Sequence, residues 1–555
     1  MVKHSSEGAV PWPGPEAERY RRAGYWEDRP LAAQILETAE RVPGRIAVVD
    51  AVDGTRMTYA ELVDRADAAA ERMLETGLRR DDRVMVVLPN GWQFIVFTLA
   101  CLRAGIIPVM ALPAHRQYEL RFLSNLAEAR AFVAADAVKG FDYQDLADEL
   151  RSNVPTLEWA VISGAAREGN IALKELLAPG DDPEGARARL DRDAPKGDDP
   201  ALFLLSGGTT GVPKLIVRTH NDYACNIKAT TAVSALDEDS AYLVSMPVSH
   251  NFPLACPGVL GALLLGARVV SVPSPNPAKV FPVIRAESVT DTAVVPAVAQ
   301  KWIEFEEEHR TGDLASLRAI QVGGSRMPDE LARRVGPVLG CTLQQVFGMA
   351  EGLINMTRLD DPEEVVCTTQ GRPVSEADEV RIVDPHLEDL PDGTPGAILT
   401  RGPYTPRGYY SAPEANAKSF EPGGWYSSGD IVERRPDGNL VVQGRDKDMI
   451  NRGGEKVSAE EIESLVYRIP GLSIVAAVSM PDEVLGEKVC LYAQMSAGGT
   501  LTLAQVQQHL TDIGVADYKI PERVVVVDEI PKTKVGKIDK KALRVDIAER
   551  VSKGS

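Results

Sequence analysis

The chain has 555 residues, of which 44% are hydrophobic and 25% are charged. This average composition excludes a disordered, collagen-like or low-complexity chain, and the length predicts about three or four compact units. The 61 Lys and Arg residues against 80 Asp and Glu residues give a net charge of −19, which disfavours a nucleic-acid partner because such a surface repels phosphate backbones.

The cysteines and the apolar segments indicate a cytoplasmic protein. The six cysteines form no C-x-x-C pair and have no histidines at zinc-ligand spacing, as expected for reduced thiols. The first residues, MVKHSSEGAV, lack the apolar core of a secretory signal. The most apolar stretch, residues 94–112, contains Arg103 and Pro108, so no transmembrane helix and no membrane partner are expected.

Residues 57–322 alternate between helix and strand signals. Thr58 and Glu61 form a capping box at the start of an amphipathic helix that Gly77 ends. The alternation predicts layered α/β subdomains with largely parallel sheets. Residues 179–200 are rich in Pro, Gly and Asp and predict a surface loop. The strands are expected at residues 83–88, 158–163, 201–205, 242–246, 268–272, 292–295 and 318–322.

The pattern changes near residue 374. Short β-like segments between glycines and prolines, at residues 380–383, 397–400 and 440–443, predict a small β subdomain. After Arg445, Ser458 and Glu461 cap a separate helix, and the alternation of helix and strand signals restarts. We therefore expect a large N-terminal domain, residues 1–445, and a small C-terminal α+β domain, residues 446–555.

A loop rich in Gly, Ser and Thr follows the strand expected at residues 201–205. Its sequence from Leu204 to Lys214, LLSGGTTGVPK, offers amides and hydroxyls that can surround phosphate oxygens, and Lys214 adds a positive charge. The loop is not a Walker A motif, because Pro213 precedes the lysine and Leu215 follows it. A Gly-rich hairpin without a ligand is the alternative interpretation.

Two further motifs could bind a nucleotide. In the segment from Gln345 to Glu351, Phe347 could stack on a base and Glu351 could hold Mg²⁺. Asp430, after the glycine of WYSSGD, could accept the hydroxyls of a ribose, and Arg445 could add a contact. A solvated glutamate and ordinary β-turns are the alternatives for these two motifs.

The last motif is a basic segment near the C-terminus. Residues 531–555 contain eight Lys and Arg residues but three Asp and Glu residues. Gly536 precedes Lys537, which indicates a tight turn that presents one amine. A solvated basic tail is the alternative interpretation.

In this order, the four motifs resemble the adenylate-forming superfamily, which includes acyl-CoA synthetases, luciferases and the adenylation domains of peptide synthetases. The resemblance extends from Thr58 to Lys541. Within the superfamily, the chain is most similar to stand-alone aryl-acid AMP ligases, the salicylate and 2,3-dihydroxybenzoate enzymes. The segments that carry this closer similarity are 11–13, 20–26, 111–116, 250–258, 321–324 and 345–352.

The resemblance implies ATP and Mg²⁺ as cofactors and gives each motif a role. Lys537 is the expected catalytic contact to the carboxylate and the α-phosphate, and His250 is expected to gate the acid pocket. Glu351 would hold Mg²⁺, and Lys447 would be the hinge that makes the small domain mobile. The expected ATP-binding residues are Ser206, Gly207, Gly208, Thr209, Thr210, Gly211, Lys214, Gly323, Gly324, Phe347, Gly348, Asp430 and Arg445.

The same resemblance places the aryl acid beside Asn251 and Cys256. Related enzymes that activate amino acids carry an Asp at the position of Asn251 to pair with the ammonium group, so a neutral Asn disfavours an amino acid. The thiol of Cys256 is a weak hydrogen-bond donor, which favours salicylate over 2,3-dihydroxybenzoate; simple packing of the thiol is the alternative. The expected pocket comprises Asn251, Phe252, Cys256, Gly324, Ser325, Met349 and Ile354.

The expected reaction is ATP-dependent formation of an aryl-AMP with release of pyrophosphate. The acyl group would then pass to the phosphopantetheine thiol of an aryl carrier protein that acts in trans. The alternatives are an aryl-CoA ligase and a non-catalytic binding or scaffold protein. Because acyl carrier proteins are usually acidic, Lys540 and Lys541 are expected to help dock the carrier.

Overall fold

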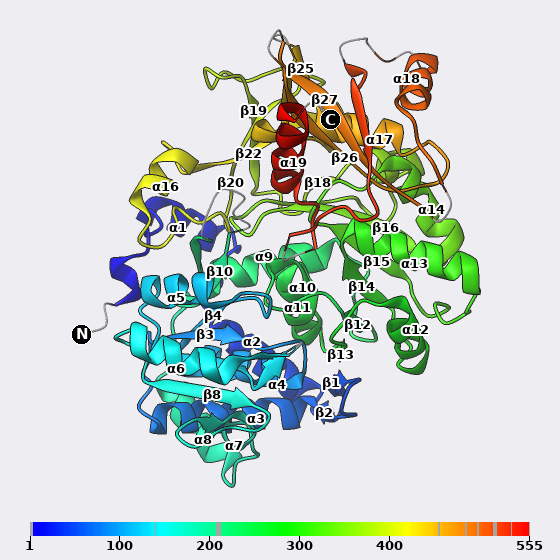
Figure 1. Ribbon diagram of the computed structural model, residues 1–555. Helices are drawn as coiled ribbons and strands as arrows, with labels where there is room; N and C mark the ends of the chain where they lie inside the picture. The colour runs from blue at the N-terminus through cyan, green and yellow to red at the C-terminus, as the bar shows by residue number, and fades with distance from the viewer. Residues whose placement is uncertain are drawn as a thin grey trace.

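The computed structural model describes residues 4–138, 140–206, 213–452, 455–482, 485–496, 499–513, 515, 519–533 and 536–553 (Figure 1). Within these residues, two large sheets and two five-stranded sheets are covered by helices, which confirms the predicted α/β class. No helix in the described part of the chain is long and apolar enough to cross a membrane.

A seven-stranded sheet has the strand order β11-β10-β4-β3-β5-β8-β9. Neighbouring strands are parallel apart from the β10–β11 pair. The strands are β3 (Arg83–Val87), β4 (Ile107–Met110), β5 (Ala131–Ala135), β8 (Trp159–Ser163), β9 (Ile171–Ala172), β10 (Pro200–Leu205) and β11 (Leu215–Thr219).

A nine-stranded sheet has the order β18-β17-β16-β15-β14-β12-β13-β1-β2. Its central strands, from β16 to β1, are parallel, while β2, β17 and β18 are antiparallel to their neighbours. The strands are β1 (Ile46–Asp50), β2 (Arg56–Thr58), β12 (Ala241–Val244), β13 (Arg268–Ser271), β14 (Asp291–Val294), β15 (Ala319–Gly323), β16 (Thr342–Gly348), β17 (Ile354–Met356) and β18 (Arg372–Pro373). The seven strands expected from the sequence are therefore all present.

Five helices pack between these two sheets and share one apolar cluster with both. They are α2 (Leu31–Arg41), α3 (Tyr59–Glu75), α4 (Trp92–Ala104), α9 (His220–Ala232) and α11 (Gly258–Leu265). The predicted capping box starts α3, because the hydroxyl of Thr58 accepts from the amide of Glu61 and the carboxylate of Glu61 accepts from the amide of Thr58.

The other elements of the N-terminal part surround these sheets and helices. They are η1 (Ser5–Glu7), α1 (Gly14–Arg22), α5 (Gln117–Leu126), β6 (Ala137–Val138), β7 (Phe141–Asp142), α6 (Tyr143–Asn153), α7 (Leu173–Leu176), α8 (Pro183–Arg192), α10 (Asn251–Ala255), α12 (Pro277–Ala286), α13 (Pro296–His309), α14 (Asp329–Leu339), α15 (Glu363–Thr368) and α16 (Pro413–Ser419).

The loop expected at residues 179–200 is wrong in its centre, where α8 forms. Asp182 caps this helix and Pro183 occupies its first turn, both favourable at a helix start. Ala186 and Leu190 lie on one face and are buried. Arg187 then pairs with Asp67, a buried residue of α3, at 3.0 Å. Contacts with a distant helix therefore stabilise a segment whose composition alone indicated a loop.

The last third of the chain forms two smaller sheets. The first contains β19 (Glu379–Val383), β20 (Gly396–Arg401), β21 (Phe420–Glu421), β22 (Trp425–Arg434) and β23 (Leu440–Arg445). The second, orange to red in Figure 1, contains β24 (Ile450–Arg452), β25 (Glu455–Val457), β26 (Leu472–Asp482), β27 (Gly486–Met495) and β28 (Arg523–Val526), with η2 (Asp446–Asp448), α17 (Ala459–Val466), α18 (Leu503–Asp512) and α19 (Lys540–Ser552). It has apolar clusters of its own on both faces.

Candidate functional site

The predicted phosphate loop lies between β10 and β11. The amide of Ser206 donates to the carbonyl of Lys214 at 3.0 Å, and the amide of Lys214 donates to the hydroxyl of Ser206 at 3.0 Å. These two bonds hold the ends of the loop together. The residues between them, Gly207, Gly208, Thr209, Thr210 and Gly211, lie outside the described residues. The ammonium of Lys214 lies 5.1 Å from the centre of the Tyr409 ring, a cation–π contact.

The buried carboxylate of Glu351 also contacts Tyr409. The hydroxyl of Tyr409 donates to Oε1 of Glu351 at 2.9 Å. Burial raises the pKa of Glu351, and this hydrogen bond opposes the shift. A buried carboxylate of this kind fits Mg²⁺, which binds proteins through one or two carboxylates together with substrate phosphates. Phe347 and Gly348 end β16 just before this segment, and the partly buried Phe347 packs against apolar residues of β20, β22 and β23.

Asp430 and Arg445 face each other across β22 and β23. Nε of Arg445 lies 2.7 Å from Oδ1 of Asp430, and the hydroxyl of Ser428 donates to Oδ2 at 2.6 Å. The carboxylate of Asp430 is buried, and these two contacts hold it in one orientation. Each of its oxygens keeps a lone pair for a further donor.

Lys537 comes from the small C-terminal part and reaches Gly324 at the end of β15. A methyl group built on Gly324 would lie 3.6 Å from Cε of Lys537, and the left-handed backbone of Gly324, with φ +90°, favours glycine there. Lys537 keeps an exposed surface, but desolvation lowers its pKa, and the charge of Arg445 lowers it further. Asp430 and Glu351 are near enough to oppose that shift, so Lys537 shares one charged environment with both carboxylates.

Contacts between the large and small parts hold this arrangement. The hydroxyl of Tyr467, after α17, donates to Oε1 of Gln300 on α13 at 2.6 Å. The guanidinium of Arg468 lies 3.7 Å from the carboxylate of Glu330 on α14. Lys447 lies in η2, the short segment between β23 and β24, and its side chain is outside the described residues.

His250 and Asn251 begin the short helix α10. Nδ1 of His250 accepts from the amide of Phe252 at 3.4 Å, so the proton of a neutral ring is on Nε2. Burial lowers the pKa of His250 to about 4, and the charge of Lys537 contributes to the shift. The imidazole is therefore neutral at physiological pH.

Several of the expected acid-pocket residues lie beside α10. Cys256 and Ile354 belong to one apolar cluster, and the ring of Phe252 lies at its edge. This ring also covers Gly323, where a methyl group would lie 3.2 Å from Cζ of Phe252. Gly324 and Ser325 are exposed, and Met349 packs against two other apolar clusters, one of which Phe252 also contacts.

Three polar side chains at the site carry no signal in the sequence. They are Tyr409 beside Glu351, Ser428 beside Asp430, and Tyr223 on α9, whose hydroxyl donates to Oδ1 of Asn251 at 2.9 Å. Tyr223 and Tyr409 contact motif residues from distant parts of the chain, whereas Ser428 lies within the WYSSGD motif, two residues before Asp430. A tyrosine or a serine is too common to indicate such a role by itself.

The basic-tail expectation is wrong for Lys540. Its ammonium lies 2.8 Å from the carboxylate of Glu463 on α17, and its side chain is 14% exposed. It therefore stabilises the small domain internally. Lys541, the next residue, is exposed.

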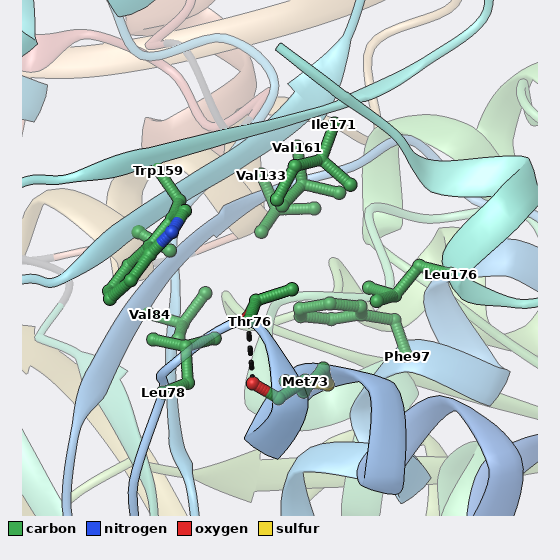
Figure 2. Close-up of a pocket in the computed structure, with 11 residues that line it drawn as sticks. Met73, Thr76, Leu78, Val84, Phe97, Val133, Trp159, Val161, Ile171 and Leu176 are labelled. Atoms are coloured by element: carbon green, nitrogen blue, oxygen red, sulfur yellow. Dashed lines mark hydrogen bonds between the residues drawn. The ribbon is translucent and has the colours of Figure 1, made fainter. Parts of the chain in front are cut away.

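A separate pocket lies among α3, α4, β3, β5 and β8, away from all these residues (Figure 2). Trp159, Phe97 and Val161 are among the side chains that line it, and Thr76 is its polar member. The hydroxyl of Thr76 donates to the carbonyl of Met73 at 2.7 Å. With no ionisable group, this pocket is a packing cavity and not a reaction site.

The chain is similar to known proteins over nearly its whole length. The family model described as AMP-binding enzyme matches residues 35–410, and the AMP-binding enzyme C-terminal domain matches residues 461–537. A salicylyl-CoA synthase / salicylate adenylyltransferase of a Streptomyces species is 54% identical over 97% of this chain and 97% of its own. A 2,3-dihydroxybenzoate-AMP ligase of Bacillus subtilis is 46% identical over 99% of both chains. A salicyl-AMP ligase / salicyl-S-ArCP synthetase of Mycobacterium tuberculosis is 46% identical over 97% of this chain and 94% of its own.

Proposed function

The chain belongs to the AMP-binding enzyme family, and we propose that its preferred substrate is salicylate. It is an ATP-dependent ligase that converts an aryl acid to an aryl-AMP, releases pyrophosphate and passes the acyl group to a thiol. The observation that carries the assignment to this site is the approach of Lys537 to Gly324, where its charge lowers the pKa of His250 and where Asp430 and Arg445 act on its own pKa.

The first half-reaction brings two anions together. The carboxylate attacks the α-phosphorus of ATP, the bond to the bridging oxygen breaks, and pyrophosphate leaves with the electron pair. The amine of Lys537 would offset the charge that grows on the α-phosphate. Glu351 would hold Mg²⁺, which supplies further positive charge to the phosphates when bound. Positioning and electrostatics therefore account for catalysis without a covalent enzyme nucleophile.

The remaining motif residues would hold the nucleotide. The oriented carboxylate of Asp430 would accept the ribose hydroxyls, with Arg445 beside it. Phe347 would lie against the adenine, and Ser206 and Lys214 hold the ends of the loop proposed for the phosphates. Gly323 and Gly324 leave room for the acid and the nucleotide to meet.

The acid would enter past the neutral ring of His250 and lie beside Asn251. A neutral imidazole keeps the entrance free of a charge that would trap the carboxylate. Cys256 closes the pocket with a small, weakly polar group, which suits a ring without a 3-hydroxyl. The 54% identity to a salicylate enzyme also supports salicylate.

The second half-reaction requires Lys537 to leave. We place the domain boundary between residues 445 and 446, where β23 ends and η2 begins, with Lys447 as the hinge. Ser458, in the small domain, donates to the carbonyl of Gln443 in the large domain, so rotation would break this hydrogen bond. The movement would open the aryl-AMP to a thiol.

The thiol acceptor is proposed to be an aryl carrier protein, and CoA is the second candidate. The name of the relative from Mycobacterium tuberculosis contains an S-ArCP product, whereas the name of the Streptomyces relative contains CoA. Incubation of the enzyme, ATP and salicylate with each acceptor separately would decide between them. The product is measured as salicyl-thioester by mass spectrometry.

The proposed substrate is tested by pyrophosphate release with a panel of acids. Salicylate should give the highest kcat/KM, with 2,3-dihydroxybenzoate next. An amino acid or an alkanoic acid as best substrate would contradict the assignment of the Asn251 pocket.

A further inference from the structure

The side chain of Tyr223 contacts Asn251 from the protein interior. Tyr223 lies on α9 and is 0% exposed, while Asn251 at the start of α10 is 6% exposed. The hydroxyl of Tyr223 lies 2.9 Å from Oδ1 of Asn251. Among the described residues, Asn251 is the sole hydrogen-bond partner of this hydroxyl.

This isolation gives the hydrogen bond a direction. A buried hydroxyl must place its proton on an acceptor, because an unsatisfied buried donor is costly. Burial also raises the pKa of Tyr223 well above its usual range, so the proton is present at any working pH. If the amide of Asn251 were turned over, its N–H would meet the hydroxyl oxygen and the hydroxyl proton would have no acceptor.

The ring of Tyr223 is held in place by Arg218. The guanidinium of Arg218 lies 4.8 Å from the centre of the Tyr223 ring and strengthens the hydroxyl as a donor by drawing charge from the ring. Arg218 is itself fixed by a 2.6 Å ion pair with Asp222 and by a 3.1 Å bond to the carbonyl of Ala350.

The amide of Asn251 therefore turns its Nδ2 end toward the pocket. Its Oδ1 accepts from Tyr223 on α9, and one N–H of Nδ2 points to Sγ of Cys256 at 3.4 Å. An amide carries two N–H groups, so one remains for a ligand. A ligand beside Asn251 must present an acceptor to satisfy it.

The proposed pocket places the ortho group of the acid beside this N–H, and ortho-substituted benzoates differ in what they present there. The hydroxyl of salicylate donates its only proton to its own carboxylate and shows lone pairs outward. The amine of anthranilate donates one proton to its carboxylate and shows its second N–H outward, while its lone pair is drawn into the ring. Salicylate thus matches an amide N–H, and anthranilate opposes it.

We propose that Tyr223 is a positioning residue that holds Asn251 as a donor, and that the enzyme thereby selects aryl acids with an acceptor ortho to the carboxylate. This inference rests on the proposed aryl-acid function. It extends that function from one acid, salicylate, to a general preference for the kind of group that stands ortho to the carboxylate.

The test compares kcat/KM for pyrophosphate release with salicylate, anthranilate and benzoate. The wild type should prefer salicylate to anthranilate by about tenfold or more, the usual effect of opposing two buried donors. In Tyr223→Phe, Oδ1 becomes free, the amide can turn over, and the salicylate-to-anthranilate ratio should fall by about tenfold. The matched control is Tyr242→Phe, a buried tyrosine whose hydroxyl has no partner among the described residues, and its ratio should equal that of the wild type.

A second variant distinguishes the loss of this hydrogen bond from a loss of folding. In Asn251→Asp, one carboxylate oxygen still accepts from Tyr223 and the other presents an acceptor, so preference should shift toward anthranilate. An unchanged ratio in both variants, with melting temperatures near that of the wild type, would overturn the inference. Equal use of salicylate and anthranilate by the wild type would overturn it as well. If no aryl acid releases pyrophosphate, the proposed function itself fails.

Discussion

Replacing Tyr409 with Phe should change the pH dependence of adenylation through Glu351. The variant removes the 2.9 Å hydrogen bond to the carboxylate and keeps the ring that contacts Lys214. A hydrogen bond to a charged group contributes about 1.5–3 kcal/mol, which is roughly 10- to 150-fold in the balance between the ionised and the protonated carboxyl. Because burial already raises the pKa of Glu351, loss of this bond should raise it further.

The sign of the effect follows from the role proposed for the carboxylate. Glu351 must be ionised to hold Mg²⁺, so activity is lost as the pH falls through its pKa, and a higher pKa moves this loss to higher pH. We expect the acid limb of kcat/KM for Mg·ATP to move upward in Tyr409→Phe, with recovery toward the wild-type rate at alkaline pH.

Pyrophosphate release with saturating salicylate, measured from about pH 5.5 to pH 9 at several Mg²⁺ concentrations, records this shift. Tyr410→Phe is the control, because Tyr410 is also buried but its hydroxyl has no hydrogen bond to a described residue. A uniform loss of activity at every pH in Tyr409→Phe would refute the reasoning and leave Tyr409 as a packing residue.

Lys537→Ala should slow adenylation by roughly 10²–10³-fold, whereas thioester formation from supplied aryl-AMP should change far less; equal losses would mean that the amine does not act in adenylation. Lys540→Ala should lower the free energy of unfolding by about 3–5 kcal/mol, because it leaves Glu463 buried without its partner. Lys541→Glu should leave the urea midpoint nearly unchanged but raise the KM for an acidic carrier; an unchanged KM would show that Lys541 is a solvated surface residue without a role in docking. Cys256→Ser should move the kcat/KM ratio toward 2,3-dihydroxybenzoate by roughly 5- to 150-fold, since a hydroxyl supplies a partner for the 3-hydroxyl, and a ratio that does not move would show that the thiol only packs.

The α/β class and most strand positions were predictable because they depend on local patterns. A run such as residues 83–87 is apolar throughout, as a parallel strand covered on both faces must be. The capping box at Thr58 was predictable for a similar reason, since both partners lie within one helical turn.

The failures lie where distant contacts outweigh composition. Residues 183–192 contain Gly and several charges, yet they form a helix because Arg187 reaches the buried Asp67 and Leu190 enters the core. Lys540 belongs to a basic run, yet it is paired inside the domain because α17 brings Glu463 beside it. Sequence spacing carries no information about such pairs.

The proposed site also contains both residues that the sequence predicts and residues that it does not. The motifs supply groups that would touch the substrates, whereas Tyr223 and Tyr409 come from outside these motifs and hydrogen-bond to Asn251 and Glu351. The two tyrosines lie far apart in the sequence, so no sequence motif links them.

Arg218 lies between the residues proposed to bind the aryl acid and the residue proposed to bind Mg²⁺. Its charge lies beneath the ring of Tyr223, which holds Asn251, and its guanidinium donates to the carbonyl of Ala350, the residue before Glu351. A buried guanidinium is stable only with its partners in place, here Asp222 and backbone carbonyls. We therefore expect a change that moves the Ala350–Glu351 segment to act on Tyr223 as well, so that the residues proposed for the aryl acid and for Mg·ATP would be coupled through one buried side chain.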